Sequence, residues 1–204
     1  MFALGHMAAR SCSVPADIMG MKRERISKQR IIEAFMSESF TRGAEGTSLS
    51  DIAAALGIKK SSLYNHYPNR EAIVSDALSY CGGLLCARIP LWLDVARADS
   101  GDFLFAFARA LFADFGSGQL VEAVSLVESE KFFDDVAFSV SSRFKVGMVG
   151  AIFPVLGARA DGFVGALCLM LDDYVSAGKM MARRGFGIEV SEEKLRALIN
   201  GFSR

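Results

Sequence analysis

The residues best suited to chemistry form a polar run that follows Gly57. The run contains two lysines, two serines, a tyrosine, an asparagine and a histidine: Lys59, Lys60, Ser61, Ser62, Tyr64, Asn65 and His66. Displayed by one helix, such side chains can hydrogen-bond base edges in the DNA major groove and neutralise phosphates. No nucleophile–base pair and no phosphate-binding glycine loop has a recognisable spacing. The pattern predicts a DNA contact, and we expect the protein not to be an enzyme.

Two short helices must hold this polar run in position. The first should begin at an S-x-x-D capping box formed by Ser48 and Asp51 and should end at Gly57. The second, over 60–66, is too short to be stable alone and must be held by packing. A helix over 27–42 would precede them with an apolar inner face. Two short helices joined by a glycine-containing turn form a helix-turn-helix, whose second helix enters the major groove.

Helical periodicity continues to the C-terminus, and alternating strand patterns are scarce. Helices are predicted over 27–42, 49–56, 60–66, 70–88, 102–115, 118–127, 130–156, 161–184 and 192–203. We therefore expect an all-α protein of about nine helices, with an N-terminal three-helix DNA-binding domain and a C-terminal helical ligand-binding and dimerisation domain. The expected divisions are a disordered extension at 1–20, the helix-turn-helix domain at 21–69 and the helical body at 70–204.

Charge separates these two domains although the formal net charge of the chain is zero. Between Met21 and Arg70, nine lysines and arginines stand against five acidic residues, so the rest of the chain is acidic overall. A basic head on an acidic body is consistent with double-stranded DNA as a partner of the head.

Several classes of site are not expected. The four cysteines form no C-x-x-C pair, and only two histidines are present, so we predict no metal and no cofactor. Scattered cysteines in apolar helices are typical of buried thiols in a cytoplasmic protein. Uninterrupted apolar runs stay below the ~18 residues needed to span a membrane, so no membrane segment is expected.

The stretch from Gly46 to Ile73 resembles the signature of the tetracycline-repressor (TetR/AcrR) family. The run L-Y-N-H-Y-P-N-R-E, Leu63–Glu71, is its most diagnostic part, and the match extends over about Ile31 to Leu78. The resemblance implies a homodimeric transcription repressor that binds a palindromic operator and is released by a small-molecule effector. It implies DNA contacts, carried over by position, at Thr47, Ser48, Ser50, Lys59, Lys60, Ser61, Ser62, Tyr64, Asn65, His66 and Arg70.

Four positions depart from the family pattern, and one of them is Ala44, which stands where Phe or Tyr is common and whose space Phe40 could fill. Family members usually combine a small residue at the position of Phe35 with a large aromatic at that of Ser39. Since these positions are helical neighbours, we expect a compensating repacking. Lys59 replaces a frequent capping serine, which predicts a weaker cap and an added positive charge.

An effector pocket in the body would need apolar and aromatic lining, and the predicted effector is small and apolar or amphipathic. The candidate lining residues, each of which could equally be plain core, are Trp92, Phe103, Phe107, Phe112, Phe133, Met148, Phe153, Met170 and Tyr174. Polar groups for orienting the effector could come from Arg109, Asp173 or Tyr174.

The small-residue segment 161–184 would form a two-fold interface with a second copy, together with the apolar face of the last helix. That face comprises Leu195, Leu198, Ile199 and Phe202. An internal core helix at 161–184 is the other interpretation. A non-repressor DNA-binding protein on the same scaffold, either an activator or a chromosome-organising factor, is the alternative function.

Overall fold

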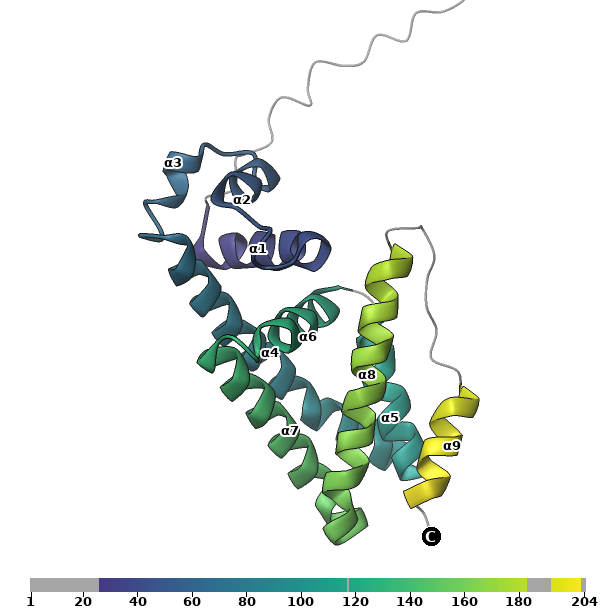
Figure 1. The fold of residues 1–204 in the computed structure, drawn as a ribbon. Coiled ribbons are helices and arrows are strands. Elements are labelled where there is room, and N and C mark those ends of the chain that lie inside the picture. Colours follow the sequence, from purple (N-terminus) through teal and green to yellow (C-terminus); the bar gives the residue numbers. More distant parts are fainter. Residues whose placement is uncertain (1–25, 117, 183–191, 203–204) are drawn as a thin grey trace, which may run out of the picture.

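The computed structural model describes residues 26–116, 118–182 and 192–202. The predicted extension 1–20 and the predicted helix cap at Ser191 lie outside these residues. Over the described part the chain forms nine α-helices, one short 3-10 helix and no strand, which confirms the all-α prediction (Figure 1). The elements are α1 Lys28–Arg42, α2 Leu49–Ala55, α3 Lys60–Leu63, α4 Arg70–Ala98, α5 Phe103–Asp114, α6 Gln119–Glu130, α7 Asp135–Leu156, η2 Gly157–Arg159, α8 Ala160–Ala182 and α9 Glu192–Phe202.

Helices α1 to α3 form a head at the N-terminal end of the long helix α4 (Figure 1). Ser27 is the N-cap of α1, because its hydroxyl accepts a hydrogen bond from the Arg30 amide at 3.3 Å, which agrees with the predicted start of this helix. The apolar face of α1 contains Ile31, Phe35 and Met36, all fully buried. Helix α1 contacts both α4 and α6, so the head rests directly on the body.

Helix α4 continues through Pro90 to Ala98, so the predicted end near Arg88 is wrong. A proline inside a helix removes one backbone donor, but neighbouring packing can hold the helix together. Here the buried face of α4 continues beyond the proline with Trp92 and Ala96. On α5, Asp114 accepts hydrogen bonds from Arg88 Nε at 2.8 Å and from Trp92 Nε1 at 2.6 Å. This contact ties the α4 turns on both sides of Pro90 to α5.

Two other helix boundaries differ from the prediction for identifiable reasons. Helix α7 begins at Asp135 and not at 130, because the Asp134 carboxylate caps it by accepting from the Val136 and Ala137 amides. Helix α3 ends at Leu63 and not at 66. The proline at position 68 disfavours helical geometry for the residue before it, so the chain turns instead.

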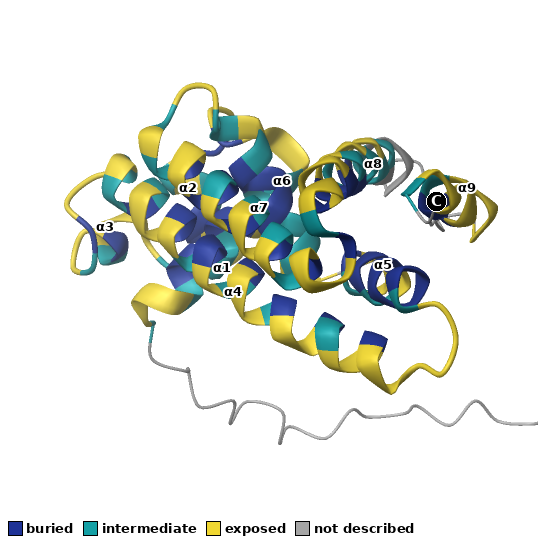
Figure 2. Cartoon of the chain, turned by 90° about the horizontal axis from the view of Figure 1, so that it is seen from below, coloured by how far each residue is buried: buried dark blue, intermediate teal, exposed yellow. Residues whose placement is uncertain are grey.

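The core of the body is an aromatic cluster around Trp92, the single tryptophan. Its ring lies 6.2 Å from Phe107, 5.7 Å from Phe115 and 6.2 Å from Phe144, measured between ring centroids. Helix α5 is buried along most of its length, as its apolar sequence predicted (Figure 2).

Helix α9 packs its apolar face inside the subunit, beside α5 and α8 (Figure 1). Leu195 and Ile199 are buried, and Phe202 stacks edge-on against Phe163 at 5.5 Å. Leu195 and Ile199 of this face are therefore covered within the subunit, while Leu198 and Phe202 are partly buried, and the contact of this face with a second copy stays a prediction. The sequence pattern identified an apolar face correctly but could not say what covers it.

Two helical stretches are long and apolar enough, by length and composition alone, to cross a membrane. They are Arg70–Ala98 and Asp135–Ala177. The sequence-based expectation counted uninterrupted apolar residues and missed them, because charged residues interrupt both stretches. Within Asp135–Ala177 only 33% of the most apolar 18-residue segment is buried, so this part of the molecule exposes much apolar surface.

Candidate nucleic-acid interface

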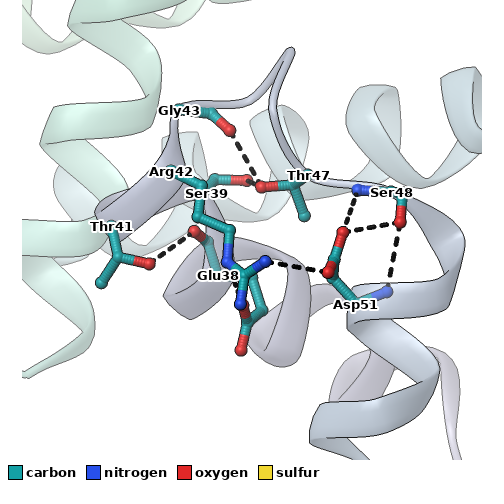
Figure 3. Close-up of polar contacts among 8 residues, drawn as sticks. All are labelled: Glu38, Ser39, Thr41, Arg42, Gly43, Thr47, Ser48 and Asp51. Atoms are coloured by element: carbon teal, nitrogen blue, oxygen red, sulfur yellow. Dashed lines mark hydrogen bonds and ion pairs between the residues drawn. The ribbon is translucent and has the colours of Figure 1, made fainter.

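The turn before α2 is organised by the predicted capping box. The Ser48 hydroxyl accepts from the Asp51 amide at 3.3 Å, and the Ser48 amide donates to Asp51 Oδ2 at 2.9 Å (Figure 3). Hydrogen bonds from the Ser48 side chain and backbone, helped by the charge of Arg42, lower the pKa of Asp51. The carboxylate thus stays ionised and holds the start of α2 in place.

Thr47 lies inside the head and not on its surface, so its predicted phosphate contact is wrong. Its side chain is fully buried, and its hydroxyl donates to the Gly43 carbonyl at 2.9 Å. Ser39 donates to the same hydroxyl at 3.4 Å (Figure 3). Thr47 therefore fixes the α1–α2 connection from within, and its hydroxyl cannot reach DNA.

Arg70, at the start of α4, points back into the head. Its Nε donates to the Thr47 carbonyl at 2.9 Å, and its Nη2 donates to the Ala44 carbonyl. In place of the DNA contact implied by the resemblance, Arg70 makes two contacts with backbone oxygens. A guanidinium in this position links α4 to the α1–α2 connection, which the sequence alone did not indicate.

The polar run on and after α3 is displayed outward over a small apolar base. Leu63 and Tyr67 are buried beneath it, and this packing holds a one-turn helix that could not stand alone. Of the predicted DNA contacts, those with exposed side chains are Ser48, Ser50, Lys59, Lys60, Ser61, Tyr64 and Asn65, and those with partly buried side chains are Ser62 and His66.

Two expected departures from the family pattern are visible in the head. Phe35 is fully buried while Ser39 is buried through its bond to Thr47, which fits the expected exchange of large and small residues. Lys59 is the N-cap of α3 and makes no side-chain capping bond, because a lysine ammonium cannot accept a hydrogen bond from a backbone amide. Its charge is therefore available at the start of the recognition helix.

The nine predicted pocket residues differ widely in burial among the described residues. Trp92, Phe107 and Met148 are packed solidly in the core. Phe112 stacks edge-on against Tyr174 at 5.8 Å between ring centroids. The remaining four are Phe103 and Met170, which are partly buried, and Phe133 and Phe153, which are 87% and 58% exposed. Phe133 and Phe153 cannot line an internal pocket of one subunit, because the turn before α7 and the outer face of α7 direct them outward.

Two of the hollows in the described part of the body contain none of the nine predicted lining residues. A surface groove of about 500 Å³ lies between α4, α5 and the start of α6, next to Arg88 and Asp114. A smaller cavity of about 150 Å³ lies between α6 and α8 and includes Ser125, Glu128 and Lys179. Sequence reasoning missed the second site because its residues are polar and come from two helices distant in sequence.

These features define a class of protein: a basic helix-turn-helix DNA-binding head on an all-helical body. Residues 31–77 match the model of the bacterial regulatory proteins of the tetR family. The run at Leu63–Glu71, which carries the resemblance in the sequence, lies within this matched segment.

Curated relatives resemble the head alone. The biofilm operon icaADBC HTH-type negative transcriptional regulator IcaR of Staphylococcus epidermidis is 39% identical over 54 residues. The aligned part is 26% of this chain and 29% of IcaR, so the chain spans less than a third of the relative's length.

Solved structures resemble the whole fold at low identity. A protein from Mesorhizobium loti described as a tetR-family transcriptional regulator superposes with a TM-score of 0.61 at 14% identity, over 86% of this chain and 94% of that chain. The multidrug binding protein EbrR, complexed with imidazole, gives a TM-score of 0.62 at 17% identity, over 88% and 96% of the two chains. The body therefore shares its fold with such proteins, while its sequence has diverged.

Proposed function

We propose that this chain is a transcription repressor that binds a palindromic operator as a homodimer and leaves it when a small molecule binds the body. The observation that supports this most is the outward row of polar side chains over the base formed by Leu63 and Tyr67, within a tetR-family segment. IcaR, which resembles the head, is a negative regulator by name. A cytoplasmic location follows from this role.

The proposed DNA contacts differ from the sequence-based set by two residues. Thr47 and Arg70 are removed, because their polar groups bind backbone oxygens of the head. The remaining contacts are Ser48, Ser50, Lys59, Lys60, Ser61, Ser62, Tyr64, Asn65 and His66. Lysines near phosphates supply affinity, whereas Asn65 is placed to read a base edge.

The proposed dimer uses the outer face of α7. Phe138, Val146 and Phe153 are exposed there, on the side opposite the buried Phe144 and Met148. A second copy is the occupant that the function requires, because one recognition helix reads few base pairs and a palindrome needs two heads. The most apolar segment within Asp135–Ala177 is only partly buried, which supports an interface on the same surface.

Three contacts between head and body could transmit effector binding. Arg70 joins α4 to the α1–α2 connection. Lys179 of α8 lies over the ring of Phe40 in α1, with its Nζ 5.3 Å from the ring centroid. Glu122 of α6 interacts with Ser37 of α1. A ligand that binds better to one arrangement of these contacts shifts the population between two spacings of the heads.

The proposal is tested by fluorescence anisotropy with DNA from upstream of the protein's own gene. We expect binding that needs both half-sites of a palindrome and weakens steeply with salt. Asn65→Ala should change the base preference by about 1–3 kcal/mol at one position of each half-site, and Lys60→Ala should weaken all sequences equally.

Glu71→Gln, at an exposed position just beyond the proposed contacts, is the matched control and should leave the base preference unchanged. Binding that ignores palindromes, or an unaltered preference in Asn65→Ala, would contradict sequence-specific reading by this head. Increased transcription from a bound promoter would indicate the activator alternative.

A further inference from the structure

Helices α4 and α7 pack side by side and run in the same direction (Figure 1). Two glycines lie in their contact, Gly82 on α4 and Gly147 on α7. A Cβ atom at Gly82 would lie 3.0 Å from Val140 Cγ2 of α7, and one at Gly147 would lie 2.9 Å from Ile89 Cδ1 of α4. Each helix therefore has a glycine notch that receives a branched side chain of the other helix, and a side chain on either glycine would displace its neighbour.

The two notches lie at matching distances along both helices. Gly82 and Ile89 are seven positions apart on α4, and Val140 and Gly147 are seven positions apart on α7. Seven residues of a helix span about 10 Å, so both pairs meet in one register. The small residue belongs to α4 at the first pair and to α7 at the second, so the two helices interlock in both directions.

This interlock opposes any sliding of α4 along α7. The residues one turn before and one turn after Gly82 on the same face of α4 are Leu78 and Leu85, both fully buried. A slide of one turn in either direction would press Val140 of α7 onto one of these leucines. Val140 is itself fully buried and β-branched, so it has few rotamers in which it could avoid the clash. One-turn slides of this kind switch some other proteins between two states, but the packing opposes one here.

The α4–α7 pair joins the head to the surface proposed for the dimer. Arg70, in the first turn of α4, donates to the carbonyl oxygens of Thr47 and Ala44 in the α1–α2 connection. Val146, next to the notch at Gly147, is 70% exposed on the outer face of α7. Direct contacts therefore run without interruption from that face, through α4, to the head.

Helix α6 meets the head in a different way. It lies against α1, but neither helix contains a glycine, so side chains alone separate the two backbones. Glu122 of α6 interacts with Ser37 of α1 through polar groups. Helices that are separated by side chains can shear past each other by small rotamer changes, whereas interlocked backbones cannot.

We propose that α4 and α7 act as one rigid unit and that the head changes position by moving against α6, not by sliding α4 along α7. The rigid unit transmits the spacing set by a second copy at the outer face of α7 to the recognition helix. This inference rests on the proposed function, because the spacing of two heads matters only to a protein that binds a palindrome.

Thermal unfolding of the free protein tests the interlock. Gly82→Ala should lower Tm by about 2–4 °C, because the stiff Val140 side chain leaves no room for the added methyl group. In a Val140→Ala background the same substitution should raise Tm by about 2–4 °C, because the room exists and alanine favours a helix. The same direction of change in both backgrounds would refute the interlock.

Gly83→Ala is the matched control for this comparison. Gly83 is the adjacent glycine of α4, is exposed, and has open space where a Cβ would lie. Its substitution should raise Tm in both backgrounds, because only the gain in helix propensity remains. A control that also changed sign with Val140 would show that the effect does not come from the notch.

A disulfide between α4 and α7 tests whether the unit stays rigid when it binds DNA. The 3.0 Å approach of a Cβ at position 82 to the Val140 side chain suits a disulfide between cysteines at both positions. Gly82→Cys with Val140→Cys is made in a Cys86→Ser background, which removes the exposed native thiol. The oxidised and reduced forms should bind operator DNA with the same Kd. A Kd that changes about tenfold or more on reduction would refute the rigid unit.

Hydrogen–deuterium exchange with and without operator DNA locates the motion. We expect exchange to change in α6, which lies outside the proposed DNA contacts, and to stay constant over 82–89 and 140–147. Changed exchange over both of these segments, with α6 unaffected, would mean that α4 moves along α7.

The thermal comparison needs no DNA, so the two proposals fail in distinguishable ways. A sign change in Gly82→Ala without any operator binding would refute the repressor function and leave the interlock standing. Operator binding that depends on the state of the disulfide would refute the rigid unit and leave the repressor function standing.

Discussion

Arg70 shows how one side chain can stabilise the connection between two domains. Its guanidinium donates to the carbonyl oxygens of Thr47 and Ala44, both of which belong to buried residues of the α1–α2 connection. Hydrogen bonds from a charged group contribute more than neutral ones, and their loss leaves buried acceptors unpaired. The position of α4 relative to the head therefore depends on this residue.

We predict that Arg70→Ala lowers the free energy of unfolding by about 2–3 kcal/mol, measured by urea denaturation. Arg97→Ala is the control, because Arg97 is exposed and pairs only with Asp94 at 3.6 Å. If Arg70 instead bound phosphate, its loss would leave stability unchanged and reduce the salt dependence of DNA binding by one phosphate contact.

The cysteines differ in their surroundings more than their spacing suggested. Cys81 is buried, Cys168 is partly buried and Cys86 is exposed, so the expectation of buried thiols is wrong for Cys86. Burial raises the pKa of Cys81 to about 12 and that of Cys168 to about 11. Thiolates react and thiols do not, so these two residues should be inert near neutral pH.

We predict that iodoacetamide modifies Cys86 in the native protein and leaves Cys81 and Cys168 unmodified until denaturant is added. Peptide mass spectrometry after alkylation at pH 8 measures each site separately. Rapid modification of Cys81 in the native protein would mean that α4 opens away from the core.

Glu122 links pH to stability at the contact between body and head. Burial raises the pKa of this half-buried α6 carboxyl, and a hydrogen bond from Ser37 of α1 offsets part of the shift. Because the folded state then binds the proton more tightly than the unfolded state, the contribution to stability is present at low pH. It is lost as the pH rises through the folded-state pKa.

We predict that Glu122→Gln is more stable than the natural sequence at pH 7. This advantage should disappear below about pH 4, where the Glu122 carboxyl is protonated in both the folded and the unfolded state. Thermal unfolding across this range measures the difference. Glu45→Gln, at an exposed position in the head, should have little effect at any pH. An advantage for Glu122→Gln that grew on acidification would contradict the assigned direction.

At the scale of elements, the α4–α5 contact explains how a helix passes through a proline. Asp114 Oδ2 accepts from Arg88 on one side of Pro90 and from Trp92 on the other. The proline removes one intrahelical hydrogen bond, and a carboxylate on another helix holds the two flanking turns together.

We predict that Asp114→Asn lowers the free energy of unfolding by about 2 kcal/mol, because Arg88 loses its ion-pair partner and the bond from Trp92 becomes a neutral one. Trp92 is the only tryptophan, so its fluorescence should report the same change at α4–α5. Asp94→Asn removes a carboxylate from an exposed pair with Arg97 and should cost less than about 0.5 kcal/mol. Equal effects of the two variants would show that the α4–α5 contact is not important.

At the scale of the whole molecule, the outer face of α7 is an exposed apolar surface. This face presents Phe138, Val146 and Phe153 to the surroundings. A second copy would bury these side chains and also fix two heads at one spacing, which sequence-specific binding to a palindrome requires.

We predict that Val146→Asp converts the proposed dimer into a monomer, as measured by light scattering during size-exclusion chromatography, because a buried unpaired charge is costly at an interface. The monomer should lose palindrome-dependent binding while its head stays folded. Val95→Asp, at an exposed apolar position on α4, is the control and should remain dimeric. A dimeric Val146→Asp, or partition of the natural protein into phosphatidylcholine vesicles, would reject this surface.

Much of the head followed from the sequence alone. The caps at Ser27 and Ser48 use contacts no more than three residues apart, so local sequence contains all the information that they need. The run at Leu63–Glu71 likewise identified the family segment, because the helix-turn-helix is built from neighbouring residues.

Tertiary structure decided the features that depend on distant partners. Arg70 looked like a DNA contact until the fold paired it with backbone oxygens 23 and 26 positions away. The apolar face of α9 was visible in the sequence, but only packing against α5 and α8 showed that its Leu195 and Ile199 are covered within the subunit. The α6–α8 cavity has no sequence pattern at all, because it arises where two helices distant in sequence leave a space. Local periodicity determines which face of a helix is apolar, whereas its burial depends on contacts that form only when the whole chain has folded.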